Sequence, residues 1–111
     1  MRIISKTRLR AFWTASPARS DAERPLTVWH DIVSDAAWKS PAEVKQVFGV
    51  NVDLVKVGSG NTVFVFDIHG NKYRLIAAIH FLKLHYENGR VYVLRIVTHA
   101  EYDDERWKQN L

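Results

Sequence analysis

Hydrophobic side chains in the first part of the chain recur at helical spacing. Leu9, Phe12 and Trp13 stand at positions i, i+3 and i+4, so they form one apolar stripe of a predicted helix whose basic residues face solvent. This helix should end before Pro17, because the residue preceding a proline is pushed out of the helical region. A Ser-x-x-Glu sequence at 20–23 then has the form of a capping box and predicts the start of a second helix.

The second and third predicted helices also have an apolar side. In the second helix the apolar side consists of Leu26, Trp29, Val33 and Ala37. Another Ser-x-x-Glu sequence at 40–43 has proline at the first helical position, and it predicts a third helix that ends at Gly49. The residues of this helix that should face inward are Val44, Val47 and Phe48.

From residue 53 onward the pattern changes to short β-branched and aromatic runs separated by turn residues. Strands are predicted at 53–57, 62–68, 72–82 and 90–98, with a further short candidate at 2–5. Short turns between consecutive strands are typical of an antiparallel meander. The predicted fold class is therefore α+β, with N-terminal helices packed on one face of a twisted antiparallel sheet, and residues 1–111 form one domain. A short polar tail that contains Trp107 ends the chain.

Alternation along the last two strands sorts their side chains onto two faces of the sheet. In the strand at 72–82 the core face would carry Tyr73, Leu75, Ala77, Ile79 and Phe81, and the open face Lys72, Arg74, Ile76, Ala78 and His80. In the strand at 90–98 the core face would carry Tyr92, Leu94 and Ile96, and the open face Val91, Val93, Arg95 and Val97. Arg74 and Arg95 are therefore expected on one exposed surface.

Two clusters of polar residues should meet at one end of this surface. Arg74 and His99 are equidistant from the turn near residues 86–88, and residues so placed pair across an antiparallel hairpin. The segments at 71–74 and 98–103 are thus predicted neighbours. Arginine, histidine and tyrosine together could cut RNA without a metal. The 2′-hydroxyl would attack the adjacent phosphate, while histidine or tyrosine moves protons and arginine stabilises the phosphate charge.

The same residues also have purely structural explanations. Thr98-x-x-Glu101 is itself a capping box, and it could do no more than start a C-terminal helix that leaves His99 in solvent. Arg74 and Arg95 could be solvated charges on an open sheet face. Local sequence does not choose between these explanations and a catalytic cluster.

Composition narrows the classes of function without choosing one. Sixteen Lys and Arg against twelve Asp and Glu give a net charge of +4, which suits a polyanion such as RNA or an acidic protein partner. The chain has no cysteine, and His80 and His85 would lie on opposite faces of a strand, so neither a metal nor another cofactor is expected. The first ten residues lack the apolar run of a signal peptide and no stretch approaches a membrane span, which predicts a cytoplasmic protein.

The sequence GNKYRLIAAIHF, followed by VYVLRIVTHAEYDD, closely resembles the pair of motifs that mark the HigB family of type II toxins. The upstream segments RLRAFW and WKSPAEVKQVF are similar to the helical half of that family, so the resemblance extends over residues 1–104. It implies a RelE-like fold, ribosome-associated cleavage of mRNA and neutralisation by a HigA-type antitoxin with a helix-turn-helix domain. Operator DNA would be bound only through the antitoxin.

The resemblance also implies roles for individual residues. Arg74, His99 and Tyr102 are the expected catalytic residues: Arg74 would hold the phosphate, while His99 and Tyr102 would transfer protons or stack on a base. The expected RNA-binding residues are Lys72, Arg95 and Lys56. The hairpin HFLKLHYENGR is long for the family and could reshape one edge of the site. The segment GSGNTVFVF lacks a basic residue immediately before its strand, which could weaken contact with RNA.

Two other interpretations stay open at this point. A non-cleaving RNA-binding or antitoxin-binding module would keep the fold and the basic face, and would bind RNA without producing cuts. A purely structural subunit would be indifferent to charge reversal at Arg74. The predicted convergence of Arg74, His99 and Tyr102 favours an endoribonuclease over both.

Overall fold

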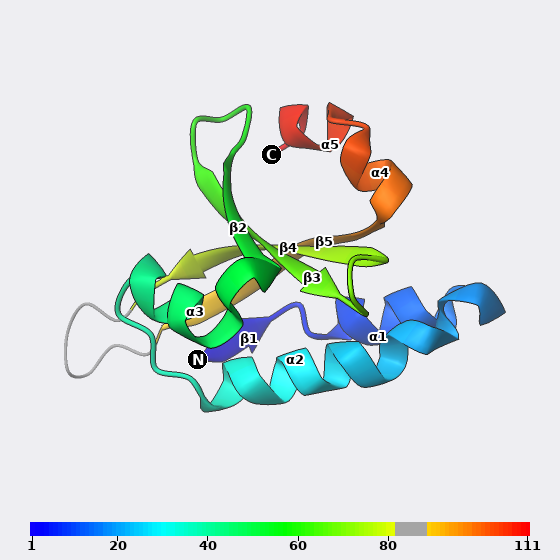
Figure 1. Ribbon diagram of the computed structural model, residues 1–111, viewed down its shortest axis with the longest axis horizontal. Helices are drawn as coiled ribbons and strands as arrows, with labels where there is room; N and C mark the ends of the chain where they lie inside the picture. The colour runs from blue at the N-terminus through cyan, green and yellow to red at the C-terminus, as the bar shows by residue number, and fades with distance from the viewer. Residues whose placement is uncertain (82–88) are drawn as a thin grey trace.

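The computed structural model describes residues 1–81 and 89–111, and within them five strands form one sheet in the order β1-β5-β4-β3-β2 (Figure 1). The strands are β1 (Arg2–Ile4), β2 (Val52–Lys56), β3 (Thr62–Ile68), β4 (Tyr73–His80) and β5 (Arg90–Thr98). Strands β2 to β5 form the predicted antiparallel meander. Strand β1 pairs in parallel with β5, so the sheet is mixed at this edge. The predicted long hairpin at 82–90, including the expected strand end at Leu82, falls largely outside the described residues.

Helices cover both sides of the sheet, but unequally. The helices are α1 (Thr7–Thr14), α2 (Glu23–Asp35), α3 (Pro41–Phe48), α4 (His99–Asp103) and α5 (Arg106–Gln109), with 3-10 helices η1 (Pro17–Ala22) and η2 (Gly49–Asn51). Figure 1 shows α1 and α2 along one side of the sheet, and α4 and α5 on the opposite side near the β2–β3 turn. The predicted α+β class is confirmed. No helix in the described part of the chain is long and apolar enough to cross a membrane.

At two predicted helix starts the expected capping hydrogen bonds do not form. Ser20 lies inside η1, and its hydroxyl donates to the Pro17 carbonyl at 2.8 Å, so it does not cap α2. Helix α3 does begin after Ser40 as predicted, but the Ser40 side chain makes no capping bond. Glu43 instead accepts a hydrogen bond from the backbone of Lys39 at 2.6 Å. The position of these helices therefore depends on packing more than on their caps.

Two residues predicted to face the core do not. Helix α2 ends at Asp35, so Ala37 lies beyond it and is exposed, and Trp38 enters the core in its place. Val47 is 53% exposed on α3, because Val44 already occupies the side of this short helix that faces the sheet. Gly49 ends α3 as predicted, with a φ of 57° that favours glycine.

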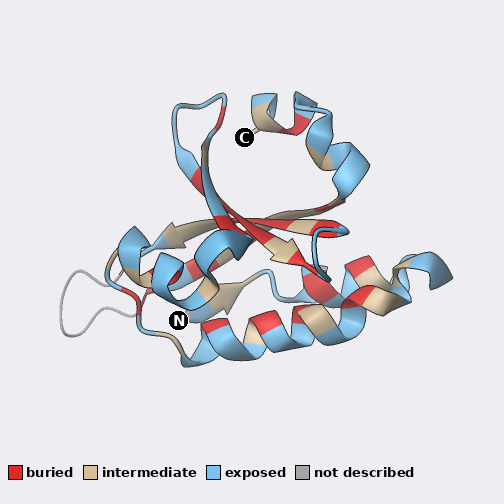
Figure 2. Cartoon of the chain, in the orientation of Figure 1, coloured by how far each residue is buried: buried red, intermediate tan, exposed pale blue. Residues whose placement is uncertain are grey.

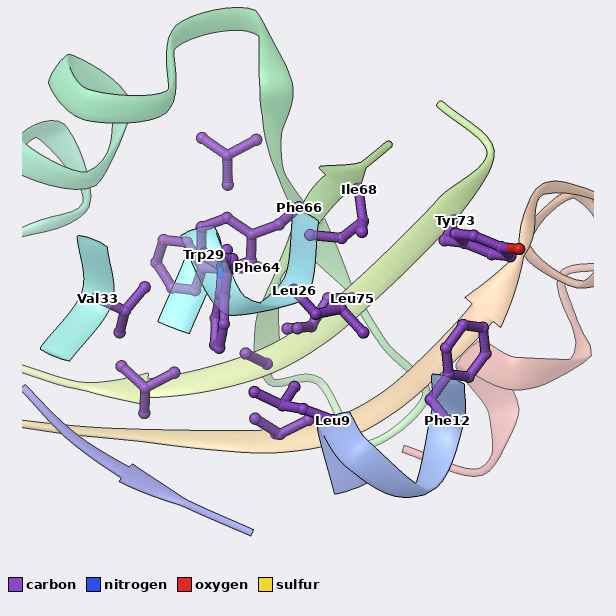
Figure 3. Packing of buried hydrophobic residues seen from close by; sticks show 14 of the residues in the cluster. Leu9, Phe12, Leu26, Trp29, Val33, Phe64, Phe66, Ile68, Tyr73 and Leu75 are labelled. Atoms are coloured by element: carbon purple, nitrogen blue, oxygen red, sulfur yellow. The ribbon is translucent and has the colours of Figure 1, made fainter. Parts of the chain in front are cut away.

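The main core lies between the sheet and α1, α2 and α3. It joins the buried stripes of the helices to the inner face of the strands, through Leu9, Phe12, Leu26, Trp29, Val33, Val44, Phe64, Phe66, Tyr73 and Leu75 among others (Figure 3). The Trp29 and Phe66 rings meet edge to face at 5.5 Å. Full burial of one such side chain contributes about 1.5–3 kcal/mol. Figure 2 shows the buried residues along the strands and at intervals on α2, whose outer surface is exposed.

A second, smaller core lies on the other face of the sheet. Its buried members are Val57, Val63, Val65, Ile76, Val97 and Trp107. Trp107 was predicted in a polar tail, but the segment forms α5 and the indole is only 4% exposed. The face that the alternation left open is therefore partly covered by the C-terminal helices.

A β-bulge changes the predicted faces of β5. Ile76 of β4 pairs with Arg95, but the next residue, Ala77, pairs with Val93, so Leu94 is an extra residue in β5. Alternation is interrupted there. Val91 and Val93 consequently belong to the main core, and Leu94 packs against the second core, contrary to the prediction. Beyond the bulge the prediction holds, since Arg95 and Val97 pair with Ile76 and Arg74 on the outer face.

Candidate active site

The two segments predicted to meet do lie side by side. Tyr73 pairs with Thr98, and the backbone N–H of His99 donates to the carbonyl of Lys72 at 3.0 Å. The expected direct pairing of Arg74 with His99 is wrong, because the register between β4 and β5 places Val97 opposite Arg74. The side chains nevertheless approach each other: Arg74 Nη2 lies 3.5 Å from His99 Nδ1.

A capping box fixes the position of His99. The Thr98 hydroxyl accepts a hydrogen bond from the Glu101 backbone at 3.2 Å, and the Glu101 carboxylate accepts one from the Thr98 backbone at 3.0 Å. Helix α4 therefore begins at His99. The structural explanation of Thr98-x-x-Glu101 is correct, and it is also what directs His99 toward Arg74.

Arg74 is held by a carboxylate and by a backbone carbonyl. Its Nε lies 3.2 Å from a carboxylate oxygen of Asp67, the residue directly opposite on β3. Its Nη1 donates to the Asn71 carbonyl at 2.6 Å. The side chain is only 12% exposed, which leaves Nη2, next to His99, as the nitrogen directed toward a ligand. Arginine can bind a phosphate through two parallel N–H donors, but two of the three nitrogens of Arg74 are already bonded within the protein.

Asp67 is a site residue that the sequence analysis missed. Burial raises the pKa of its carboxyl group, the positive charge of Arg74 lowers it, and the negative charge of Asp53 raises it further. The same equidistance rule that linked Arg74 to His99 could have found Asp67, because the two strands of the β3–β4 hairpin also pair across a short turn.

One tautomer of His99 satisfies both of its side-chain contacts. Arginine can only donate, so the 3.5 Å contact between Arg74 Nη2 and Nδ1 of His99 requires a lone pair on Nδ1. The tautomer with its hydrogen on Nε2 provides that lone pair and also donates to the Asp103 carboxylate, one helical turn away at 3.1 Å. In this tautomer Nδ1 faces the side of Arg74, where a phosphate would be held.

Tyr102 lies above Arg74 and completes the cluster. The Arg74 guanidinium carbon is 5.3 Å from the centre of the Tyr102 ring, and Trp107 stacks on the same ring at 5.3 Å. Burial, and next the charge of Asp53, raise the pKa of the phenol, so its hydroxyl stays protonated at neutral pH. With its ring in contact with both neighbours, Tyr102 offers a hydrogen-bond donor more readily than a surface for a base.

The three expected RNA-binding residues have different positions. Lys72 lies next to the cluster, where it forms an ion pair with Asp21 of η1. Arg95 is half-buried at the edge of β5, beside a depression of about 420 Å³ that Glu101 also lines. Lys56 pairs with Thr62 and shares the face of β2 that carries Val52, so it points away from the cluster. The structure brings Lys72 and Arg95 near the site and leaves Lys56 apart.

A cleft of about 370 Å³ adjoins the cluster on the side of η1, and we call it the Arg19 cleft. It is lined by Ser16, Ala18, Arg19, Lys72, Tyr73, Thr98, His99 and Ala100. Within residues 1–81 and 89–111, no three His, Asp or Glu side chains are grouped as metal ligands would be. The polar side chains at the site are therefore those of the cluster, Arg74, His99 and Tyr102, together with the carboxylates of Asp67 and Asp103 that contact it.

The fold and this cluster define a RelE-like fold, with α1, α2 and α3 on one face of a meander and polar residues at the end of its last two strands. Residues 22–105 match the family model of the HigB toxin, described as the RelE-like toxic component of a toxin–antitoxin system. The chain is 35% identical over 72 residues to the mRNA interferase HigB of Escherichia coli O6:H1, strain CFT073, which covers 65% of this chain and 62% of the relative. The chain belongs to the HigB toxin family.

The family match contains the cluster but not the whole chain. Asp67, Arg74, His99 and Tyr102 all lie inside the matched segment, whereas the N-terminal sequence RLRAFW and Trp107 lie outside it. The chain spans less than two thirds of the length of the curated relative.

Proposed function

We propose that this protein is the toxin of a toxin–antitoxin pair and acts as an endoribonuclease on mRNA. The observation that carries the proposal is the contact of Arg74 with His99, 3.5 Å apart, beneath the ring of Tyr102. All three residues lie within the segment matched by the toxin family, and the curated relative is an mRNA interferase. The net charge of +4 favours a polyanionic substrate.

The chemistry follows from the donors and acceptors of the cluster. When RNA binds, Arg74 Nη2 turns from His99 to the phosphate, and Nδ1 of His99 takes the proton of a ribose 2′-hydroxyl, whose oxygen attacks the neighbouring phosphorus. Arg74 Nη2 donates to the phosphate oxygen on which negative charge develops. The bond from phosphorus to the 5′-oxygen breaks, and the phenol of Tyr102, which is protonated at neutral pH, gives its proton to that oxygen. The products are a 2′,3′-cyclic phosphate and a 5′-hydroxyl, and no metal takes part.

Two finer parts of the proposal concern partners. Cleavage takes place on mRNA bound to the ribosome, and a HigA-type antitoxin with a helix-turn-helix domain neutralises the protein and supplies contact with operator DNA. Membership of a toxin–antitoxin family supports an antitoxin partner. Co-expression of the neighbouring reading frame should restore growth to cells that produce the toxin. Growth that stays arrested would remove this part of the proposal.

The direct test is expression in a bacterial host, with growth measured and new mRNA 5′ ends mapped. The variants are His99→Ala, Arg74→Ala and Tyr102→Phe. Their matched controls are His80→Ala, Arg10→Ala and Tyr92→Phe, which remove the same groups away from the cluster. The wild type and the controls should arrest growth and cut translated frames. The three site variants should lose at least about 100-fold in cutting, the usual size of a general acid–base contribution.

A non-cleaving RNA-binding or antitoxin-binding module is the second candidate, and a specific observation favours it. Each basic group of the cluster has an acidic neighbour: Arg74 contacts Asp67, His99 contacts Asp103, and Lys72 contacts Asp21. These carboxylates compete with a phosphate for the same donors. Normal growth and absence of cuts with a folded wild-type protein would establish this candidate in place of the nuclease.

A further inference from the structure

We infer that the Arg19 cleft binds one nucleobase of the RNA, that of a nucleotide next to the scissile phosphate, and thereby contributes to the choice of cutting site. This inference rests on the proposed nuclease function. It adds a recognition role for residues of η1, which the catalytic cluster itself does not use.

The cleft is continuous with the catalytic cluster. His99 lines the cleft and also contacts Arg74, and Lys72 lines it beside the ion pair with Asp21. A phosphate held by Arg74 Nη2 therefore places the adjoining nucleotide at the cleft entrance. With a volume of about 370 Å³, the cleft can admit a single unstacked base.

One wall of the cleft carries a planar cation that is held in place. The Arg19 guanidinium carbon lies 4.6 Å from the centre of the Phe12 ring. Phe12 in turn packs edge to face on Tyr73 at 5.1 Å, and both rings belong to the main core (Figure 3). Unpaired RNA bases commonly stack on arginine planes. Because Phe12 restrains Arg19, little side-chain freedom would be lost when a base stacks there.

Polar groups in the cleft can recognise the edge of that base. Ser16 precedes η1, and its hydroxyl makes no capping hydrogen bond. The Tyr73 hydroxyl is held by the Asp21 carboxylate at 2.6 Å, so this wall is fixed. Ser16 can donate to or accept from a base edge, whereas Arg19 supplies stacking that tolerates any base. Base preference should therefore depend on Ser16, and affinity on Arg19.

The test uses the full chain and 2′-O-methyl RNA heptamers, which bind but cannot undergo attack by a 2′-hydroxyl. In each heptamer a different position is abasic, and binding is followed by fluorescence anisotropy. For the wild type, loss of the base at one position should weaken binding about tenfold, the size expected for one stacked base. That penalty should disappear in Arg19→Ala and in Arg19→Lys, which keeps the charge but not the plane.

Arg10→Ala is the matched control, because it removes an exposed arginine of the neighbouring helix α1. It should keep the single-position penalty. In cells, Ser16→Ala should change the base frequency at one position beside the mapped cuts while cutting continues. Circular dichroism melting checks that the variants are folded.

The outcomes separate this inference from the function on which it rests. If RNA binds and is cut in cells, but the abasic penalty is unchanged by both Arg19 variants, the subsite is wrong and the nuclease proposal stands. A wild type that binds RNA equally well at every abasic position overturns the subsite as well. If the protein neither binds the heptamers nor creates cuts, the proposed function fails and the subsite fails with it.

Discussion

The face of the sheet under α1, α2 and α3 and the face under α4 and α5 differ in how many of their residues are buried. Among the described residues, the cluster under α1, α2 and α3 has seventeen buried members, whereas the cluster under α4 and α5 has six. Six members of the first are aromatic, whereas Trp107 is the one aromatic residue among the buried members of the second. The second ends beside Arg74, Tyr102 and their acidic neighbours.

This difference separates the residues that stabilise the fold from those of the candidate site. The large core fixes the strands, and hence the backbone from which Arg74 and His99 project. The small core fixes only the end of the chain: Trp107 stacks on Tyr102, and its indole N–H donates to the Tyr102 carbonyl at 2.9 Å. Damage to the first face should therefore unfold the protein, and damage to the second should disable the site at a lower cost in stability.

The largest effect is expected from Phe66→Ala in the main core. Phe66 is fully buried and packs on Trp29 and Phe48, so its truncation leaves a cavity and should lower the free energy of unfolding by about 4 kcal/mol. Urea denaturation measures this loss. Val50→Ala, at a position that is 89% exposed, should change stability by less than about 0.5 kcal/mol. Equal losses for the two variants would contradict the assigned core.

A smaller effect is expected from Trp107→Ala in the second core. It should lower the free energy of unfolding by about 3 kcal/mol or less, because the terminal helix α5 can detach locally. RNA cutting should fall more than this loss explains, since Tyr102 loses its stacking partner. Trp107→Phe keeps a stacked ring and should restore most of the activity. If Trp107→Ala unfolds the protein as completely as Phe66→Ala does, the two faces are not separable.

The next effect concerns the capping box. Thr98→Ala removes the acceptor for the Glu101 backbone and should cost about 1 kcal/mol in the free energy of unfolding. Cutting should fall as well, because His99 begins the helix that this bond holds. Thr14→Ala, which only removes a hydroxyl bonded within α1, is the control and should leave cutting unchanged. A Thr98→Ala variant with full activity would show that α4 needs no cap to position His99.

The smallest effect is electrostatic. Hydrogen bonds from Lys72 and Tyr73 hold the pKa of Asp21 below its ordinary value of 3.8. A depressed pKa means that this contribution to stability is fully present above pH 3.8 and is lost as the pH falls through the lower folded value. The stability difference between the wild type and Asp21→Asn should be constant near neutrality and shrink in acid. A difference that stays constant into acid would contradict this assignment.

Hydrophobic periodicity predicted most of the fold. The bounds of β3 and β5 agree with the alternation, and α1 follows the stripe of Leu9 and Phe12, because burial on one face is a local property of sequence. The bulge at Leu94 and the burial of Trp107 were missed. Both depend on how distant segments fit together, and neither changes the local pattern enough to be recognised.

The site was predicted less completely than the fold. Pairing across one hairpin predicted that Arg74 and His99 meet, and they do, although the register differs. Pairing across the β3–β4 hairpin points to Asp67 as the partner of Arg74, whereas Asp21, which holds Lys72, lies far away in sequence in η1 and gives no local sign of its partner. The assigned roles of Arg74, His99, Tyr102, Lys72, Arg95 and Lys56 stay predictions.

The measurement that tests the central claim most directly is the chemistry of the RNA ends in cells that express the protein. Libraries that capture 5′-hydroxyl and 5′-phosphate ends separately are compared for the wild type, His99→Ala and the His80→Ala control. Attack by the 2′-hydroxyl at the Arg74–His99–Tyr102 cluster predicts new 5′-hydroxyl ends with the wild type and the control, and their loss with His99→Ala. New 5′-phosphate ends, or 5′-hydroxyl ends that persist in His99→Ala, would contradict the account.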